Sequence, residues 1–414
     1  VTTGLAKQTP VFDAERLDDR VPAPALPPPR SDLPGAESEA AILYTSGTTG
    51  RPKGCIITNR YMVTTGQWYA SAGGVIDFSH GNARLYTPMP LFHMAGLCLN
   101  SMGMLMSANC LILPDRFHPK TLWQDVIETR ATALHYLGVV PAMLLAQPES
   151  ELERRHGIRF GLGGGASPAL RQRFEQRFGF PLAEGWGMTE TGRSTFDAFE
   201  PRRLDRYAIG APRNGFEARI VDDNDNELPR GTPGELVVRY AGPDPRFGFF
   251  AGYLKDPEAT EAAWRGGWFH TGDVATQDAD GMLYFVDRKK HVVRRAGENI
   301  AAAEVELILA SHPAVKQVAI LPAPDELRQE EVLACVELRG GHAADATQAR
   351  ALFDWCNERL AYYKAPGWIL FFDALPLTAT HKVAKTQIFA AGEDPRTRPG
   401  IFDFRAAKKR DGQR

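Results

Sequence analysis

Short apolar runs alternate with amphipathic stretches along the first half of the chain. Four runs bounded by turn residues are typical of buried β-strands, namely residues 41–44, 85–88, 110–113 and 133–140. Two stretches between them have helical periodicity: residues 58–69, with Thr58 or Asn59 as N-cap, and residues 119–129. Strands that alternate with helices predict an α/β fold with parallel strands in its sheet.

The pattern changes after about residue 205. Turns rich in Asp, Asn, Gly and Pro then separate three short strands, at residues 217–221, 234–239 and 281–286, which predicts a small β-rich subdomain. Beyond residue 288 the pattern predicts a compact α+β piece, with helices at 301–310 and 347–360 and strands at 315–321 and 332–338. The basic end, residues 406–414, is predicted to be a disordered tail.

The composition is that of a globular protein with a full core. Of the 414 residues, 43% are hydrophobic and 24% are charged. The net charge of -2 gives no electrostatic case for a nucleic-acid partner, which needs a basic patch. Five cysteines without a C-x-x-C pair indicate no disulfide framework and favour a reducing cytoplasm. The apolar region 91–113 is interrupted by polar residues and glycines, so a buried helix and strand explain it better than a membrane span.

A loop rich in Gly, Thr and Ser, Tyr44–Gly54 (YTSGTTGRPKG), follows the first predicted strand. Its glycines let backbone N–H groups approach an anion, while its hydroxyls and lysine add donors and positive charge. The loop is not a Walker A motif, because Pro52 precedes Lys53 and a glycine follows it. A flexible surface loop is the alternative, although such loops seldom combine these residues directly behind a buried strand. The candidate phosphate-binding residues are Thr45, Ser46, Gly47, Thr48, Thr49, Gly50 and Lys53.

This loop resembles the phosphate-binding signature of the adenylate-forming superfamily, which includes acyl-CoA synthetases, nonribosomal adenylation domains and beetle luciferases. Further motifs follow in the family's order: PLFH at 90–93, GGGASP at 163–168, GWGMTE at 185–190, WFHTGD at 268–273, DRKK at 287–290, RAGENI at 295–300 and LTATHKVAK at 377–385. The resemblance covers about residues 40–390. Within the acyl-CoA synthetase branch, the motifs are most similar to those of carnitine/crotonobetaine-type ligases.

The resemblance implies roles for individual residues. His93 lines and gates the acyl pocket, with a structural histidine at a strand end as the alternative. The other implied roles are the adenine edge for Gly164, Gly165 and Ala166, an aromatic face near the adenine for Trp186 with Gly187, a hydrogen bond to the α-phosphate for Thr189, a Mg²⁺ ligand for Glu190, and ribose contacts for Asp273 and Arg288.

The resemblance also implies a hinged pair of domains. Lys290 is the pivot between them, Gly297 lines a pantetheine tunnel, and Lys382 is the catalytic lysine. His381 stands where many members carry glycine, which leaves Lys385 as the fallback. The predicted parts are a large domain at 1–288 with its β-rich subdomain at about 205–288, a hinge at 289–290, a small mobile C-terminal domain at 291–390, and a tail at 391–414.

The expected activity is that of an ATP-dependent carboxylic acid–CoA ligase, which uses ATP, Mg²⁺ and coenzyme A and acts on a small carboxylic acid in the cytoplasm. A homodimer is compatible with this activity. One alternative is an adenylation enzyme that loads a carrier protein. Another is a truncated chain or a nucleotide-binding pseudoenzyme, because only 43 residues precede Tyr44, fewer than in full-length members. Arg193 is expected either to pair with a second carboxylate of a polar acid or to lie on the surface.

Overall fold

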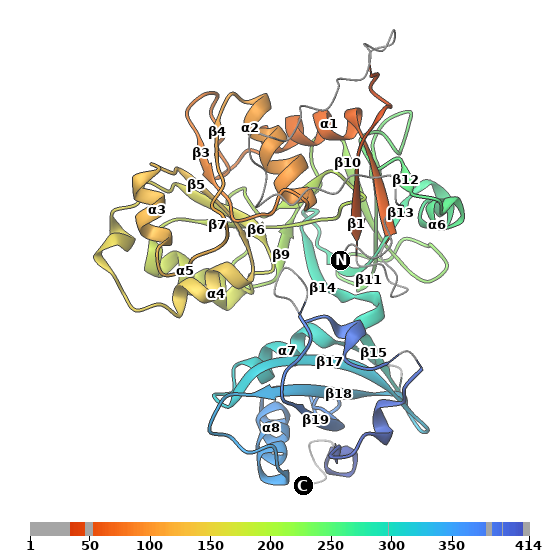
Figure 1. Ribbon diagram of the computed structural model, residues 1–414. Helices are drawn as coiled ribbons and strands as arrows, with labels where there is room; N and C mark the ends of the chain where they lie inside the picture. The colour runs from red at the N-terminus through yellow and green to blue at the C-terminus, as the bar shows by residue number, and fades with distance from the viewer. Residues whose placement is uncertain (1–33, 46–52, 297, 378–382, 391, 409–414) are drawn as a thin grey trace, which may run out of the picture.

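The computed structural model describes residues 34–45, 53–296, 298–377, 383–390 and 392–408. These residues form a large lobe and a smaller lobe that are joined just after residue 288 (Figure 1). The large lobe contains helices packed on a mixed sheet together with two antiparallel sheets, and the small lobe is an α+β unit. The predicted α/β fold class, with a large N-terminal part and a small C-terminal part, is confirmed.

The central sheet of the large lobe has the strand order β4-β3-β5-β6-β7-β8. Its first five strands are parallel and β8 is antiparallel to β7. The predicted strand at 133–140 ends at residue 137, because α4 begins at Val139. The strands are β3 (Arg84–Tyr86), β4 (Cys110–Ile112), β5 (Ala133–Leu137), β6 (Phe160–Gly164), β7 (Leu182–Gly187) and β8 (Ser194–Phe196).

Helices cover this sheet, and α1 begins where the sequence indicates. Thr58 is its N-cap and accepts a hydrogen bond from the N–H of Tyr61 at 3.2 Å. The apolar region 91–113 folds into two short helices and β4, as expected. The helices are α1 (Asn59–Ala70), η2 (Ala95–Ser101), α2 (Met102–Met106), α3 (Leu122–Glu128), α4 (Val139–Leu145), η3 (Glu151–Arg154) and α5 (Pro168–Phe178).

The first strand does not belong to the central sheet. β1 (Glu39–Thr45) pairs antiparallel with β2 (Lys53–Thr58), which in turn pairs with β12 (Gly252–Tyr253). The predicted strand at 41–44 is present, but the prediction that it is buried is wrong, because only Leu43 of these residues is buried and Tyr44 is 67% exposed. Strand β2 was not predicted from the sequence, since its pairing depends on a distant segment.

The β-rich part is an antiparallel sheet with the order β10-β11-β13-β14-β9. The three predicted strands are present, but residues 269–273 of the WFHTGD motif lie in a strand, β13, that was not predicted. The elements are β9 (Ala208–Gly210), β10 (Phe216–Val221), β11 (Gly234–Tyr240), α6 (Pro257–Ala263), η4 (Arg265–Gly267), β13 (Phe269–Gln277) and β14 (Leu283–Arg288).

The small lobe follows η5 (Lys289–His291) and has its own core, which includes Val293, Val305 and Phe353. Its strand order is β16-β15-β18-β19-β20, with β17 paired to β18. Its elements are β15 (Val292–Arg295), β16 (Glu298–Ala301), α7 (Ala302–Ala310), β17 (Val315–Asp325), β18 (Gln329–Leu338), α8 (Ala346–Arg359), β19 (Trp368–Phe372), η6 (Lys385–Gln387), η7 (Pro395–Thr397), β20 (Phe402–Asp403) and η8 (Arg405–Ala407).

The predicted C-terminal tail is wrong for residues 392–408, which fold onto the small lobe. β20 pairs with β19, and the Phe404 ring stacks on Phe353 with centroids 5.0 Å apart. Lys408 is buried. The basic composition suggested disorder, but two phenylalanines supply enough apolar surface to dock the segment. Residues 409–414 lie outside the described residues.

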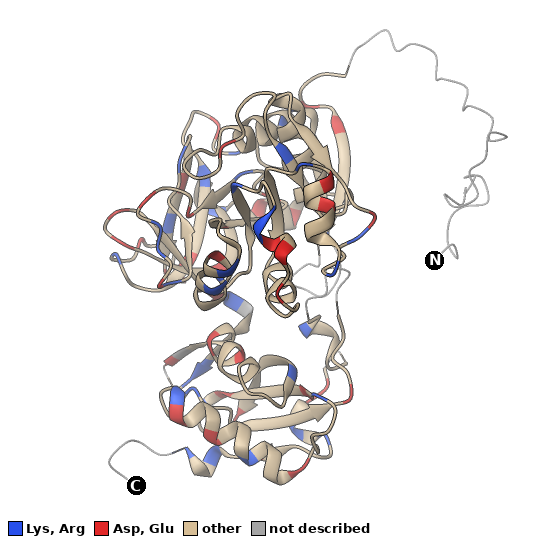
Figure 2. Cartoon of the chain, turned by 90° about the vertical axis from the view of Figure 1, so that its left-hand side faces the viewer, with Lys and Arg blue, Asp and Glu red and all other residues tan. Residues whose placement is uncertain are grey.

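Charges of both signs are interspersed over the face shown in Figure 2, with neither sign confined to one lobe. All five cysteines are free thiols, and four of them are buried. Within the described part of the chain, no helix is long and apolar enough to cross a membrane.

Candidate active site

The predicted phosphate-binding loop lies at the boundary of the described structure. Ser46, Gly47, Thr48, Thr49 and Gly50 lie outside the described residues, as do Gly297 and Lys382. The flanking residues Thr45 and Lys53 are register partners at the open end of the β1–β2 pair. The ends of the loop are therefore held side by side by an antiparallel pair.

Lys53 lies next to Tyr253, the residue that contacts Glu190. Its Nζ lies 4.6 Å from the ring centroid of Tyr253, and the Tyr253 hydroxyl donates to Glu190 Oε1 at 3.0 Å. The pairing of β12 with β2 brings Tyr253 to this place. The sequence analysis did not identify this tyrosine, because its position depends on the pairing of two distant strands.

Glu190 is a buried carboxylate with few partners. Its side chain is 5% exposed, and burial raises its pKa, although Tyr253 and the positive charge of Arg288 act in the opposite direction. The backbone carbonyl of the preceding Thr189 accepts a hydrogen bond from the Tyr61 hydroxyl at 2.7 Å. Such a carboxylate fits a hard cation, which would offset the cost of its buried charge.

Three motifs meet at Asp273. The indole N–H of Trp186 donates to Asp273 Oδ2 at 2.7 Å, and Arg288 Nε lies 2.8 Å from Oδ1. The contact of Arg288 is an ion pair without hydrogen-bond geometry, so Oδ1 accepts no hydrogen bond in the described structure. Burial raises the pKa of Asp273, which is fully buried. Strands β7, β13 and β14 thus bring Trp186, Asp273 and Arg288 together, with the side chain of Trp186 buried. Their roles toward the nucleotide stay predictions.

The predicted adenine-edge segment is held by Glu184, a residue that no sequence motif indicated. Its carboxylate accepts hydrogen bonds from the N–H of Gly165, the N–H of Ala166 at 3.2 Å and the hydroxyl of Tyr136 at 2.8 Å. Burial raises the pKa of Glu184 to about 7, offset in part by these hydrogen bonds. Close packing requires glycine at position 138, because a Cβ there would lie 1.9 Å from the carbonyl oxygen of Gly165. Gly165 itself has a φ of +97°, a backbone conformation that favours glycine.

His93 has a local structural contact. Its Nδ1 accepts a hydrogen bond from the N–H of Ala95 at 3.1 Å, at the start of η2. It also lies near His135, which is buried. Burial lowers the pKa of His135 to about 3, and the charge of His93 lowers it further. The preceding Phe92 is 72% exposed. His93 therefore shapes the entry to η2, and its pocket role stays a prediction.

Arg193 contradicts the expectation of a surface residue. Its side chain is 5% exposed, and Nη1 donates to the carbonyl oxygen of Phe247 at 2.9 Å. The guanidinium lies 4.8 Å from the ring centroid of Tyr240. Burial lowers its pKa. Among the described residues no carboxylate forms an ion pair with it, and its aromatic contacts explain its position.

The predicted hinge is anchored to the large lobe by the residue before Lys290. Lys290 lies within η5, where the Nζ of Lys289 pairs with Glu235 at 2.8 Å and with Asp223 at 2.9 Å. Burial alone would raise the pKa of Glu235, but hydrogen bonds and positive charges from His270 and Lys289 hold it at about 2.

A second contact near the hinge crosses between the lobes. Asp287 Oδ2 accepts a hydrogen bond from the N–H of Ala303 at 2.8 Å, in the first turn of α7. This contact is a helix cap supplied by another element.

The fallback lysine, Lys385, is engaged within the small lobe. Its Nζ lies 2.6 Å from Glu306 Oε1, and its side chain is only 13% exposed. Glu306 also accepts a hydrogen bond from the N–H of Ile320. Because this ion pair holds Lys385 within the small lobe, Lys385 is a poor candidate for a catalytic lysine that enters the large lobe. This favours Lys382 for the predicted catalytic role.

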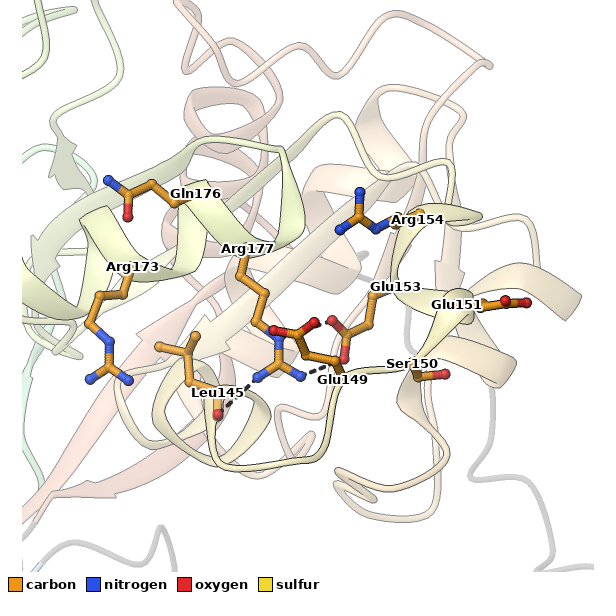
Figure 3. A pocket seen from close by; sticks show the side chains of 9 residues that line it. All are labelled: Leu145, Glu149, Ser150, Glu151, Glu153, Arg154, Arg173, Gln176 and Arg177. Carbon is orange, nitrogen blue, oxygen red and sulfur yellow. Dashed lines mark hydrogen bonds and ion pairs between the residues drawn. The ribbon is translucent and has the colours of Figure 1, made fainter.

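A surface hollow of about 930 Å³ lies apart from these residues. It lies around η3 and the C-terminal ends of α4 and α5, and Figure 3 shows Arg177 pointing toward Glu153 and the Leu145 carbonyl. Arg177 pairs with Glu153 at 2.6 Å and donates to the carbonyl of Leu145 at 3.0 Å. None of the predicted site residues lines this hollow, and its central arginine serves to join η3 to α5.

A fold of this class, with its motif residues converging at β7, β13 and β14, is that of an AMP-binding enzyme. The chain belongs to this family: the AMP-binding enzyme model matches residues 2–254, and the model of the AMP-binding enzyme C-terminal domain matches residues 304–382.

Two curated relatives are similar to this chain in sequence. Crotonobetaine/carnitine–CoA ligase of Proteus mirabilis is 32% identical over 356 residues, which are 85% of this chain and 66% of the relative. Sulfoacetate–CoA ligase of Cupriavidus necator is 33% identical over 371 residues, which are 88% of this chain and 69% of the relative. The chain thus spans about two thirds of the length of these relatives.

Solved structures show the same fold. ATP-bound MatB from Rhodopseudomonas palustris is 28% identical with a TM-score of 0.73, covering 85% of this chain and 68% of that one. The o-succinylbenzoate CoA synthetase MenE from Bacillus subtilis, in complex with its acyl-adenylate intermediate OSB-AMP, is 28% identical with a TM-score of 0.73 over 87% of this chain and 71% of that one.

Proposed function

We propose that the protein is an ATP-dependent carboxylic acid–CoA ligase that works through an acyl-adenylate. The observation that carries this proposal is the meeting of Trp186, Asp273 and Arg288, because three motifs far apart in the chain converge on one buried carboxylate. The naming of the relatives as CoA ligases supports coenzyme A over a carrier protein as the thiol acceptor.

In the first step the substrate carboxylate attacks the α-phosphorus of ATP, and pyrophosphate leaves. Displacement at phosphorus depends mainly on positioning and on stabilising charge. The loop between Thr45 and Lys53 holds the leaving phosphates, and Thr189 donates to the α-phosphate. Lys382 stabilises the negative charge that the carboxylate and α-phosphate share. The Asp273 carboxylate accepts from the ribose hydroxyls, for which its Oδ1 has spare capacity.

Glu190 would hold Mg²⁺, which when bound neutralises phosphate charge. The described residues contain no group of three or more His, Cys, Asp or Glu side chains suited to a metal. Glu190 would then be the carboxylate ligand from the protein, and phosphate and water oxygens would supply further ligands. This arrangement is the usual one for Mg²⁺ in nucleotide sites.

In the second step the thiol of coenzyme A attacks the acyl carbon and AMP leaves. The small domain, residues 291–390, rotates about Lys290 between the steps, so that the hairpin at Gly297 replaces Lys382 at the site. The ion pairs of Lys289 support this pivot, because they hold the segment before Lys290 on the large domain at 1–288.

The substrate is a small carboxylic acid, and its second functional group is the open question for experiment. The two curated relatives are named for crotonobetaine or carnitine and for sulfoacetate, acids whose other ends carry opposite charges. Free thiols at all five cysteines support a cytoplasmic location. A homodimer is the assembly to be tested by sedimentation.

The test is acid-dependent exchange of pyrophosphate into ATP, followed by formation of acyl-CoA when coenzyme A is added. The panel should include crotonobetaine, carnitine, sulfoacetate and malonate, with acetate as the control that lacks a second polar group. We expect exchange with at least one acid and thioester formation with the same acid. Exchange without thioester would favour a carrier protein, and no exchange with any acid would contradict the proposal.

A further inference from the structure

The described chain ends at a buried lysine. Lys408 follows η8, and its side chain is fully buried. Its Nζ donates to Glu331 Oε1 at 2.6 Å. Burial lowers the pKa of Lys408 to about 8, although the negative charge of Glu331 acts in the opposite direction. A lysine is rarely fully buried unless it is paired, and here a single carboxylate provides the pairing.

Glu331 joins this lysine to a second cation. Arg295 Nε donates to the other oxygen, Oε2, at 2.8 Å, and the N–H of Val332 donates to Oε1 at 2.8 Å. A Cβ on Gly367 would lie 2.2 Å from Cγ of Glu331, so the bare backbone of Gly367 makes room for this carboxylate. Each oxygen of Glu331 is therefore occupied by a different cation.

Arg295 is the last residue of β15 and faces Glu298 across the β15–β16 hairpin. It also pairs with Gln329 at the start of β18, the strand that carries Glu331. Next to it, the N–H of Ala296 donates to the carbonyl of Arg328 at 2.9 Å. The position of the hairpin is thus set at the start of β18, where Lys408 also binds to Glu331.

We propose that Lys408 is a positioning residue for the β15–β16 hairpin, because it confines Arg295 to one oxygen of Glu331. Without Lys408, Arg295 can take both oxygens in a bidentate pair, which moves the end of β15. This proposal rests on the proposed function, which assigns the hairpin to the thiol step. Adenylation uses residues of the large lobe together with Lys382, so it does not depend on Lys408.

The test compares Lys408→Met with Lys408→Arg and with the control Lys316→Met. Lys316 pairs with Glu337, a carboxylate on the same strand β18 but away from the hairpin. For Lys408→Met we expect thioester formation to fall on the order of tenfold through a higher KM for coenzyme A, because a misplacement of about 1 Å can cost a hundredfold. Pyrophosphate exchange should be unchanged. Lys408→Arg should recover most of the loss, and Lys316→Met should resemble the wild type.

Amide hydrogen exchange gives a second measurement that does not need activity. Peptides covering residues 292–301 should exchange faster in Lys408→Met and at the wild-type rate in Lys316→Met. An unchanged rate in the hairpin, or an equal fall in both half-reactions, would overturn the proposal and leave Lys408 as an anchor for the C-terminal segment. If the wild type shows no pyrophosphate exchange with any acid, the proposed function fails, while hydrogen exchange still decides whether Lys408 positions the hairpin.

Discussion

Replacing Glu184 by Gln tests how much folding stability the protein loses when a buried carboxylate next to the predicted adenine-edge segment becomes charged. Burial raises the pKa of Glu184 from 4.5 to about 7. Between these values the folded protein binds a proton that the unfolded chain has already released. A raised carboxyl pKa therefore favours the folded state at low pH, and this contribution is lost as the pH rises from 4.5 to 7.

The magnitude of the pH effect on stability follows from the difference between the two pKa values of Glu184. The pKa changes from 4.5 to about 7, and at about 1.36 kcal/mol per pKa unit the full effect is roughly 3 kcal/mol. About 2.5 kcal/mol of it falls between pH 5 and pH 8. Glutamine is neutral throughout, its carbonyl can accept from Gly165 and Ala166, and its amide group can face Tyr136. We therefore expect the wild type to lose about 2.5 kcal/mol more stability than Glu184→Gln over this range.

The assay is guanidinium unfolding at pH 5 and pH 8, followed by tryptophan fluorescence. Five of the seven tryptophans report on the large lobe: Trp68, Trp123, Trp186, Trp264 and Trp268. The control is Glu261→Gln. Glu261 is exposed, and its hydrogen bond from Arg246 lowers its pKa, so it stays ionised over the whole range. Equal losses of stability in the wild type and in Glu184→Gln would refute the reasoning.

Three further substitutions test the site. Glu190→Gln should lower the rate of pyrophosphate exchange by roughly 10²–10³ at every Mg²⁺ concentration. It should also raise the thermal stability, because it removes a buried charge. A variant that exchanges pyrophosphate at the wild-type rate would exclude Glu190 from the chemistry. Gly138→Ala should raise the KM for ATP on the order of tenfold and leave that for the acid unchanged, because its Cβ displaces Gly165; an unchanged KM for ATP would remove this segment from the nucleotide site. Arg193→Met should leave the ranking of acids unchanged at a cost of about 1 kcal/mol in stability, and a changed ranking would show that Arg193 contacts the substrate.

The sequence predicted those parts of the fold whose causes are local. Helix α1 begins at Asn59 because the hydroxyl of its N-cap, Thr58, accepts from a nearby N–H, and such a signal can be read within four residues. Strand β2 was missed because its stability comes from pairing with β1 and β12, and β12 lies in a distant part of the chain. The docking of Lys408 was missed for the same reason, since its partner Glu331 belongs to another strand.

The candidate site shows the same division. Motifs identified Trp186, Asp273 and Arg288, and the fold brings them together. Tyr253 and Glu184 belong to no recognisable motif in the sequence, and their importance appears only through their contacts. A buried polar group needs a partner wherever the chain supplies one, and sequence spacing does not reveal which segment that is.

Asp273 links the nucleotide site to the hinge through Arg288. In the structure, Arg288 forms an ion pair with Oδ1 of Asp273, the oxygen left for a ribose hydroxyl. In the proposed nucleotide site, a ribose hydroxyl bound at Oδ1 would share this oxygen with the guanidinium of Arg288, the residue that directly precedes η5. The segment after it is held by Lys289, which pairs with Glu235 on β11. The proposed ribose contact at Arg288 and the proposed pivot at Lys290 therefore flank Lys289, whose ion pair with Glu235 ties this segment to the large lobe.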